Sequence, residues 1–226
     1  MREFEHATLM DQAEALAISV GHALDLAIRV NGWAVLAVSG GRSPVPMFER
    51  LRYRPVRWEA VTVTLVDERV VPPDHPDSNG GMVRAHLLRE AAASAAFVPL
   101  IADADEVAEP ARAVARLNQA FRQPDVVVLG MGEDGHTASL FPDAPELQAA
   151  LSDPRPGYLV THPAAAPHVR VTLNLAALLG AERTFLAVAG EEKGKVLDRA
   201  KEGPAPALPV SILLANQRRG FDIFRA

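Results

Sequence analysis

The chain has 226 residues, of which 49% are apolar, and it carries a formal net charge of −5 and no cysteine. This length and composition suit a single globular domain spanning residues 1–226. The negative charge argues against a general nucleic-acid binder, which usually carries a basic stripe, and the lack of cysteine excludes disulfides and thiolate–metal sites. The first residues show no signal-peptide pattern, and no apolar run approaches the ~18 residues that span a bilayer, so we expect a cytoplasmic protein without membrane contact.

Helical and strand-like patterns alternate along the chain. Residues 8–30 repeat small and apolar side chains at helical spacing, with Thr8 or Asp11 as a cap and Asn31-Gly32 as a stop. Further helices are expected from near Ser78, over residues 105–122 and around Lys193. Strands are expected over residues 33–38, 61–66, 126–129, 168–175, 184–189 and 208–214, with a terminal edge strand over 221–224. This alternation predicts right-handed βαβ units, and therefore an α/β fold with a mainly parallel sheet flanked by helices and a small appended lobe.

The first predicted strand leads into the segment S-G-G-R-S-P at residues 39–44. Its glycines let the backbone approach a ligand closely, and Ser43-Pro44 has the pattern of a helix cap followed by a first-turn proline. Free N–H groups and hydroxyls in such a turn suit a phosphate. The candidate phosphate ligands are Ser39, Gly40, Gly41 and Ser43. The spacing is not that of a P-loop, and the alternative is a tight strand-to-helix turn with a serine cap.

The segment D-V-V-V-L-G-M-G-E-D-G-H-T-A-S-L-F-P at residues 125–142 joins a buried strand to a glycine-rich turn. It contains G-x-G-x-x-G, but Pro142 and Pro145 follow too soon for the helix of a dinucleotide site. Asp134 and His136 place a carboxylate beside an imidazole, which is the usual equipment of a general base near neutral pH. Because no G-x-S-x-G nucleophile is present, the attacking group would be water. The alternative is a polar loop histidine.

Several charged residues fall near predicted strand ends. Asp67-Glu68-Arg69 follows one strand, Arg170 lies on the polar face of another, and Lys193 begins a helix. The cations, together with the glycine turn, suggest a phosphorylated substrate, although surface cations are normally just solvated. For a metal, the only groupings are His75 with Asp74 and Asp77, and His162 with His168. Neither has a recognised ligand spacing, so we expect no metal site.

Taken together, the motifs closely resemble those of the 6-phosphogluconolactonases. The matching segments are S-G-G-R-S-P at 39–44, D-E-R-V-V-P at 67–72, D-S-N at 77–79, G-M-G-E-D-G-H-T-A-S-L-F-P at 130–142, R-V-T-L-N at 170–174 and G-E-E-K at 190–193. The resemblance implies a Rossmann-like fold of the type shared with glucosamine-6-phosphate deaminase and ribose-5-phosphate isomerase. It also implies hydrolysis of the small-molecule lactone 6-phosphoglucono-δ-lactone to 6-phosphogluconate in the pentose phosphate pathway, with no metal or organic cofactor. No feature of the sequence predicts the oligomeric state.

The resemblance also implies roles for single residues. His136 would activate water, and Asp134 would orient or support the site. The phosphate end of the substrate would meet the glycine turn of residues 39–43 together with Arg170 and Lys193, and Asp67 and Arg69 would also contact substrate. The family more often has threonine where this chain has Ser43, which keeps the hydroxyl. Asn174 stands where a smaller hydroxyl residue is expected.

Two rival functions are weighed against this resemblance. Glucosamine-6-phosphate deaminases are similar at S-G-G and D-G-H but carry a glutamate five positions after the histidine, where this chain has Phe141. A phenylalanine cannot relay protons for sugar ring opening, which favours the lactonase. A non-catalytic sugar-phosphate sensor with the same fold is the other alternative, because a fold alone does not define a function. The sequence offers no helix-turn-helix segment to support it.

Overall fold

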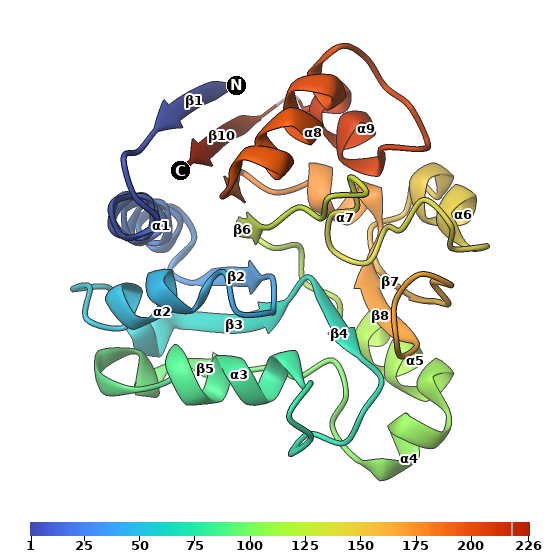
Figure 1. Cartoon of the computed structure of the whole chain (residues 1–226). Coiled ribbons are helices and arrows are strands. Elements are labelled where there is room, and N and C mark those ends of the chain that lie inside the picture. The colour runs from blue at the N-terminus through green and yellow to red at the C-terminus, as the bar shows by residue number, and fades with distance from the viewer. Residues whose placement is uncertain (218) are drawn as a thin grey trace.

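The chain folds around a seven-stranded sheet whose neighbouring strands all run parallel (Figure 1). The structure is a computed structural model that describes residues 1–217 and 219–226. In spatial order the strands are β1 (Arg2–Glu5), β10 (Gly220–Arg225), β9 (Arg183–Val188), β6 (Val126–Leu129), β2 (Ala34–Val38), β3 (Val61–Leu65) and β5 (Ala96–Phe97). The predicted α/β class with a mainly parallel sheet is therefore confirmed.

The order of the strands reverses at the centre of the sheet. From β2 the chain proceeds outward through β3 to β5, and it then returns to place β6 on the other side of β2, followed by β9 and β10. In open parallel sheets, ligands bind beyond the carboxyl ends of the strands at such a reversal. The fold thus points to the ends of β2 and β6, where both glycine-rich turns begin.

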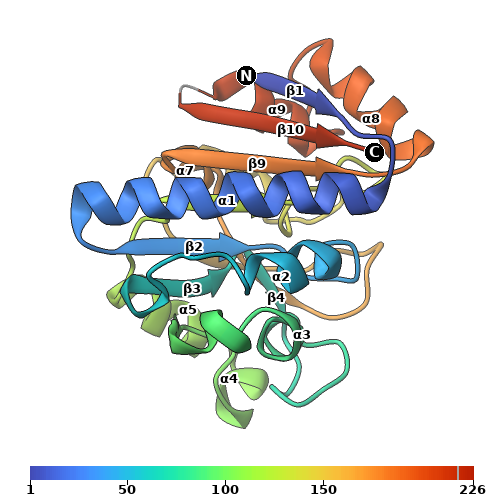
Figure 2. The ribbon, with the colours of Figure 1, turned by 90° about the vertical axis from the view of Figure 1, so that its left-hand side faces the viewer.

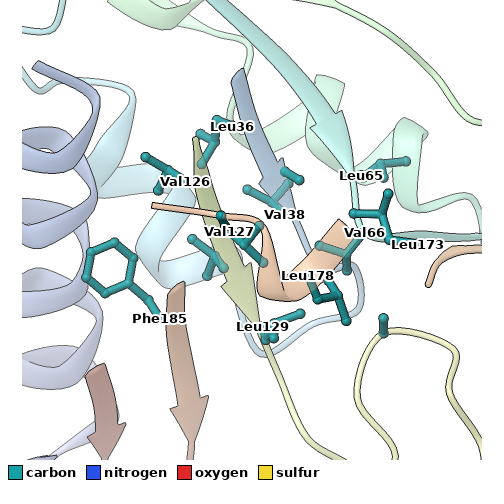
Figure 3. Close-up of a cluster of buried hydrophobic side chains, with 14 of the residues drawn as sticks. Leu36, Val38, Leu65, Val66, Val126, Val127, Leu129, Leu173, Leu178 and Phe185 are labelled. Carbon is teal, nitrogen blue, oxygen red and sulfur yellow. The ribbon is translucent and has the colours of Figure 1, made fainter. Parts of the chain in front are cut away.

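The two central strands carry only buried side chains. Every residue of β2 and β6 is buried, because helices and a second sheet cover both faces of a parallel sheet. Figure 3 shows Leu36 and Val38 of β2 beside Val126 and Val127 of β6. Such strands read as short unbroken apolar runs, which is why the sequence predicted them.

The long helix α1 (Leu9–Asn31) lies across one face of the sheet (Figure 2). Thr8 caps its start by accepting the Asp11 N–H at 3.1 Å. Gly32 ends it in the left-handed conformation, with φ of 84°, and donates its N–H to the Ile28 carbonyl. The predicted helix and both of its end signals are confirmed.

The other helices are short and connect the strands. They are α2 (Val45–Leu51), α3 (Asn79–His86), α4 (Ala104–Ala108), α5 (Pro110–Gln119), α6 (Leu147–Ser152), α7 (Leu175–Leu179), α8 (Glu191–Lys201) and α9 (Pro209–Asn216), with 3-10 turns at Trp58–Ala60 and Glu90–Ser94. The helix predicted from near Ser78 is α3, and Ser78 caps it by accepting the Gly81 N–H at 3.0 Å. No helix of the described residues is long and apolar enough to cross a membrane.

A three-stranded antiparallel sheet lies on the side of the main sheet opposite α1 (Figure 1). Its strands, in spatial order, are β4 (Asp67–Arg69), β8 (Arg170–Leu173) and β7 (Tyr158–Thr161). The polar face predicted for the 168–175 strand is not solvent-exposed, because β8 is the central strand of this sheet and all four of its residues are buried. Val171 and Leu173 of this small sheet belong to the same hydrophobic core as the main sheet, and its β4 and β8 lie beside the site described below.

Three element predictions were wrong. Residues 208–214 form the start of helix α9 rather than a strand, because Pro209 occupies the first helical turn and a short apolar run fits a buried helix equally well. Residues 105–122 form two helices, since Pro110 starts a new one. Residues 221–224 lie in β10, which is not an edge strand because β1 pairs with its outer side. The sequence did not predict β1, since its four residues are all exposed and show no strand pattern.

Candidate active site

A cavity of about 230 Å³ opens at the carboxyl ends of the central strands. Ser39 follows β2, Gly130 follows β6, and Ala189 follows β9, and all three line it. Of the ten residues predicted for the site, eight line the cavity: Ser39, Gly40, Ser43, Asp67, Arg69, His136, Arg170 and Lys193. Gly41 and Asp134 do not line it, although Gly41 follows Gly40 in the chain and Asp134 contacts His136. Segments more than 150 residues apart in the chain thus form one site, as the motifs predicted.

The first glycine turn is joined to the second by backbone contacts. Ser39 donates its N–H to the Val128 carbonyl at 2.9 Å and accepts the Gly130 N–H on its hydroxyl at 3.2 Å. Gly41 has φ of 85°, a conformation that only glycine adopts easily, so it shapes the turn. The expected cap by Ser43 is wrong: α2 begins at Val45, and no side chain caps it. Ser43 lines the cavity instead.

Two arginines lie side by side on the small sheet. Arg69 of β4 and Arg170 of β8 are direct cross-strand partners, an arrangement that like charges disfavour. Arg170 is only 6% exposed, and its Nε and Nη1 are buried without a hydrogen-bond partner. Burial lowers the pKa of Arg170. The negative charge of Asp67 acts in the opposite direction but does not offset the effect of burial. A buried guanidinium that lines a cavity with unused donors is suited to bind an anion there.

A third cation reaches the cavity from α8. Gly190, with φ of 90°, ends the loop after β9, and Lys193 follows in the first turn of the helix. Within the described part of the chain no carboxylate pairs with Lys193, whereas Lys195 of the same helix pairs with Glu191 and Glu192. Lys193 therefore brings positive charge to the cavity without neutralisation by an ion pair.

The imidazole of His136 is held by a carboxylate. Its Nδ1 lies 2.5 Å from Asp134 Oδ1, which also accepts the His136 N–H at 3.1 Å. Burial alone would raise the pKa of Asp134, but the hydrogen bonds and charge of His136 lower it, so the carboxylate stays ionised. An ionised carboxylate only accepts, so we assign the shared proton to Nδ1. In the neutral imidazole Nε2 then carries the free lone pair. Asp134 and His136 thus form the predicted acid–imidazole pair, and the contact orients the imidazole as a general base requires.

Two further residues fix the plane of this imidazole. The ring stacks on Phe141, with centroids 4.1 Å apart and an angle of 24° between the planes. A Cβ at Gly132 would lie 2.3 Å from His136 Cε1, so only glycine leaves room for the ring. Phe141, singled out in the sequence only as a difference from deaminases, therefore contacts the predicted base.

The close packing of Gly132 makes a testable prediction. Gly132→Ala is expected to displace the His136 ring and lower turnover about tenfold or more, because small misplacements of a catalytic group are costly. Binding of inorganic phosphate, measured by calorimetry, should change little, since the cations lie on other elements. Gly203→Ala is a matched control, because nothing lies within 4 Å of a Cβ there. Normal turnover in Gly132→Ala would contradict the placement of the ring.

Asp67, the first residue of β4, lines the same cavity. Its Oδ2 accepts the Ser139 hydroxyl at 2.6 Å, and the Ser139 N–H in turn binds Thr172 Oγ1 at 3.1 Å. Ser139 and Thr172 are fully buried, which fixes the carboxylate in place. An acceptor beside two arginines gives the cavity both signs of charge, and so the means to bind hydroxyl groups as well as an anion.

Asn79 lines the cavity but received no role in the sequence analysis. Its Nδ2 donates to the Asp67 carbonyl at 3.0 Å, and its Oδ1 accepts Arg69 Nη1 at 3.2 Å. A Cβ at Gly40 would lie 1.9 Å from Asn79 Cγ, so the two residues touch. The D-S-N motif pointed to this segment, but a contact across 39 positions of sequence could not be predicted from one chain.

No group of three or more histidine and acidic side chains that could hold a metal ion occurs in residues 1–217 and 219–226. His75 and Asp77, from one of the groupings considered above, instead contact His168 from the other. His168 Nε2 lies 3.0 Å from Asp77 Oδ2, and the rings of His75 and His168 meet edge to face.

The fold and the cavity define an α/β protein with a cation-lined cavity at the carboxyl ends of its central strands, next to an oriented imidazole. The model of the family described as glucosamine-6-phosphate isomerases/6-phosphogluconolactonase matches residues 7–221. The chain therefore belongs to this family.

Relatives within the family carry the lactonase name. The 6-phosphogluconolactonase of Neisseria meningitidis is 42% identical over 228 residues, which cover 99% of this chain and 97% of the relative. That of Mesorhizobium japonicum is 44% identical, covering 95% and 90%. A solved 6-phosphogluconolactonase from Shewanella baltica is 36% identical, covers 100% of this chain and 97% of its own, and has a TM-score of 0.92. A monomeric glucosamine-6-phosphate deaminase, at 17% identity and a TM-score of 0.78, shares the fold. The resemblance predicted from the motifs is confirmed.

Proposed function

We propose that this chain hydrolyses 6-phospho-D-glucono-1,5-lactone to 6-phospho-D-gluconate in the oxidative pentose phosphate pathway. One observation carries the proposal: the same cavity is lined by a buried arginine with unused donors and by a carboxylate-held imidazole. The first suits a phosphate and the second suits the activation of water. Relatives at 42–44% identity that bear the lactonase name support the same assignment.

The phosphate binds, in this proposal, between the first glycine turn and the cations. Arg170 and Lys193 supply positive charge, while Ser39, Gly40 and Ser43 line the same cavity. Charge-assisted hydrogen bonds from Arg170 would satisfy the two nitrogens that are otherwise unpaired. Anchoring the phosphate places the lactone carbonyl within a confined space, so that part of the entropic cost of reaction is met on binding.

His136 then acts as the general base. Its Nε2 takes a proton from water while the water oxygen attacks the ring carbonyl, and Asp134 stabilises the imidazolium that forms. In this proposal Arg69, which lines the cavity, stabilises the oxyanion of the tetrahedral intermediate. When the intermediate collapses, the ring C–O bond breaks and the imidazolium returns its proton to the leaving oxygen. His136 thus carries one proton from water to the leaving oxygen, and the new carboxylic acid then loses its proton to solvent to give the carboxylate.

Phe141 separates this proposal from a deaminase reaction. Deaminases carry a glutamate at this position relative to the histidine, whereas Phe141 is 6% exposed and stacks on His136. A phenyl ring cannot take or give a proton during sugar ring opening. The stacking also uses the space that such an acid would need. A sugar-phosphate sensor would have no use for the oriented imidazole.

Freshly prepared lactone tests the proposal directly. The chain should release 6-phosphogluconate, detected by a coupled dehydrogenase assay, well above the spontaneous hydrolysis measured without protein. Dialysis against a chelator is expected to leave the rate unchanged, because every step is assigned to protein side chains. No excess over the spontaneous rate would refute the activity, and a loss after chelation that added metal reverses would refute the metal-free chemistry.

We also propose that the enzyme works in the cytoplasm on a free small molecule. Phosphorylated sugars carry charge that prevents passive passage through a bilayer, so the enzyme must share a compartment with the source of its substrate. The net charge of −5 supports the expectation of no nucleic-acid partner.

A further inference from the structure

Glu68 lies between two residues of the cavity but does not line it. Asp67 and Arg69 precede and follow it in β4, and adjacent side chains of a strand point to opposite faces. Glu68 is only 2% exposed, and a buried carboxylate is unfavourable unless it is well hydrogen-bonded. The proposed chemistry gives this residue no role, so its burial calls for another reason.

The carboxylate of Glu68 fastens β4 to the start of α3. Its Oε1 accepts the N–H groups of Asn79 and Arg69, at 2.7 and 2.8 Å. Its Oε2 accepts the Gly80 N–H at 2.7 Å and the Ser78 hydroxyl at 3.2 Å. The first N–H groups of a helix lack partners within it, and a negative charge there is favourable. Four donors from two elements thus meet on one side chain.

Glu68 joins β4 and α3, and each of them contributes a side chain to the cavity lining: Arg69 from β4 and Asn79 from α3. Arg69 Nη1 donates to the Asp77 carbonyl at 2.8 Å and to Asn79 Oδ1 at 3.2 Å. Asn79 also contacts Gly40 of the first glycine turn. A shift of α3 against β4 would therefore move the partners of the Arg69 guanidinium and loosen the contact with the turn.

We propose that Glu68 is a positioning residue: by fastening α3 to β4 it sets the place of Arg69 and Asn79 at the cavity, and so the rate of lactone hydrolysis. The inference rests on the proposed activity. Burial raises the pKa of Glu68, while the three backbone N–H groups favour its ionised form, which is the form that accepts all four hydrogen bonds.

The first test replaces Glu68 with glutamine, which has the same shape. Its amide nitrogen would face donors where an oxygen now accepts two hydrogen bonds, so α3 should shift. We expect Glu68→Gln to lower kcat/KM about tenfold. In a background that already carries Arg69→Ala, the same change should cost clearly less than tenfold, because part of its effect acts through Arg69. A role in stability alone would give equal losses in both backgrounds.

Glu106 provides a matched control. It is also a buried carboxylate, at 6% exposure, and it accepts the Ala102 N–H at 2.8 Å and pairs with Arg116 at 2.6 Å, outside the cavity lining. Glu106→Gln is expected to lower the melting temperature, as Glu68→Gln does, but to leave kcat/KM within about twofold of the wild type. This pair separates a loss of stability from a loss of positioning.

Two results would overturn the inference: an unchanged kcat/KM in Glu68→Gln, or equal losses with and without Arg69. Should Glu68→Gln fail to fold, Glu68→Asp, which keeps the charge but shortens the side chain, replaces it in the same cycle with Arg69→Ala. Non-additive losses then support the coupling and additive losses refute it. The affinity for 6-phosphogluconate, measured by calorimetry across the same cycle, gives an independent readout. Absent activity in the wild type would refute the proposed function, whereas this binding cycle would still test Glu68.

Discussion

Replacing His136 with alanine is expected to lower the turnover of 6-phosphogluconolactone about 10²–10⁴-fold, the usual contribution of a positioned general base. The imidazole is the only basic side chain in the proposed cavity that is oriented by a carboxylate, among the residues the structure describes. Its side chain is 30% exposed, so the substitution should leave the fold intact. Affinity for 6-phosphogluconate should stay nearly unchanged, because the phosphate is bound by other residues. The measurement is turnover in the coupled assay, corrected for spontaneous hydrolysis.

His162 supplies the control for this substitution. Its Nδ1 lies 2.7 Å from Glu146 Oε1, the same kind of pair, but it does not line the cavity. His162→Ala should therefore turn over substrate at the wild-type rate. If His136→Ala kept near wild-type turnover, or lost product affinity as much as turnover, His136 would not be the base. The comparison separates the effect of an oriented imidazole from that of any histidine–carboxylate pair.

Local patterns in the sequence predicted most of the main sheet. Runs such as residues 126–129 are apolar throughout because both faces of a parallel strand are covered, and Gly32 and Thr8 end and cap α1 by local chemistry. The wrong predictions concern segments whose secondary structure is determined by tertiary contacts. The apolar run at 208–214 suits a helix or a strand, and the exposed strand β1 is recognisable only from its pairing with β10.

In the candidate site, too, the sequence predicted local features but not those that depend on tertiary contacts. Glycine turns and charged residues after strands were visible locally, so the cavity contains most of what the sequence predicted. The contacts made by Phe141 and Asn79 could not be predicted, because each depends on how distant segments pack. Nor could the sequence show that Arg170 is buried with unused nitrogens, a property of β8 lying at the centre of the small sheet. The buried, unpaired guanidinium of Arg170 leads to the second prediction, which concerns ligand binding and stability.

Replacing Arg170 with methionine, a side chain of similar length, is expected to weaken phosphate-ligand binding about 10–100-fold. A hydrogen bond to a charged group contributes about 1.5–3 kcal/mol, and each 1.4 kcal/mol is about tenfold in affinity. Without ligand, however, the variant should melt at the same or a higher temperature than the wild type. A buried guanidinium with two unpaired nitrogens costs free energy in the empty cavity, and an apolar side chain removes that cost. Calorimetry of 6-phosphogluconate binding and thermal melts measure the two effects.

Arg183 is the contrasting control, because its charge is paired. Its Nη2 lies 2.5 Å from Asp222 Oδ2, a carboxylate that is 4% exposed and outside the cavity lining. Arg183→Met should lower the melting temperature, since it leaves a buried carboxylate with one partner fewer, and should leave ligand affinity unchanged. In the wild type, 6-phosphogluconate should raise the melting temperature by preferential binding to the folded state, and Arg170→Met should lose most of this rise. A variant of Arg170 that lost stability but kept its affinity would make Arg170 a structural residue, and the phosphate would have to bind elsewhere.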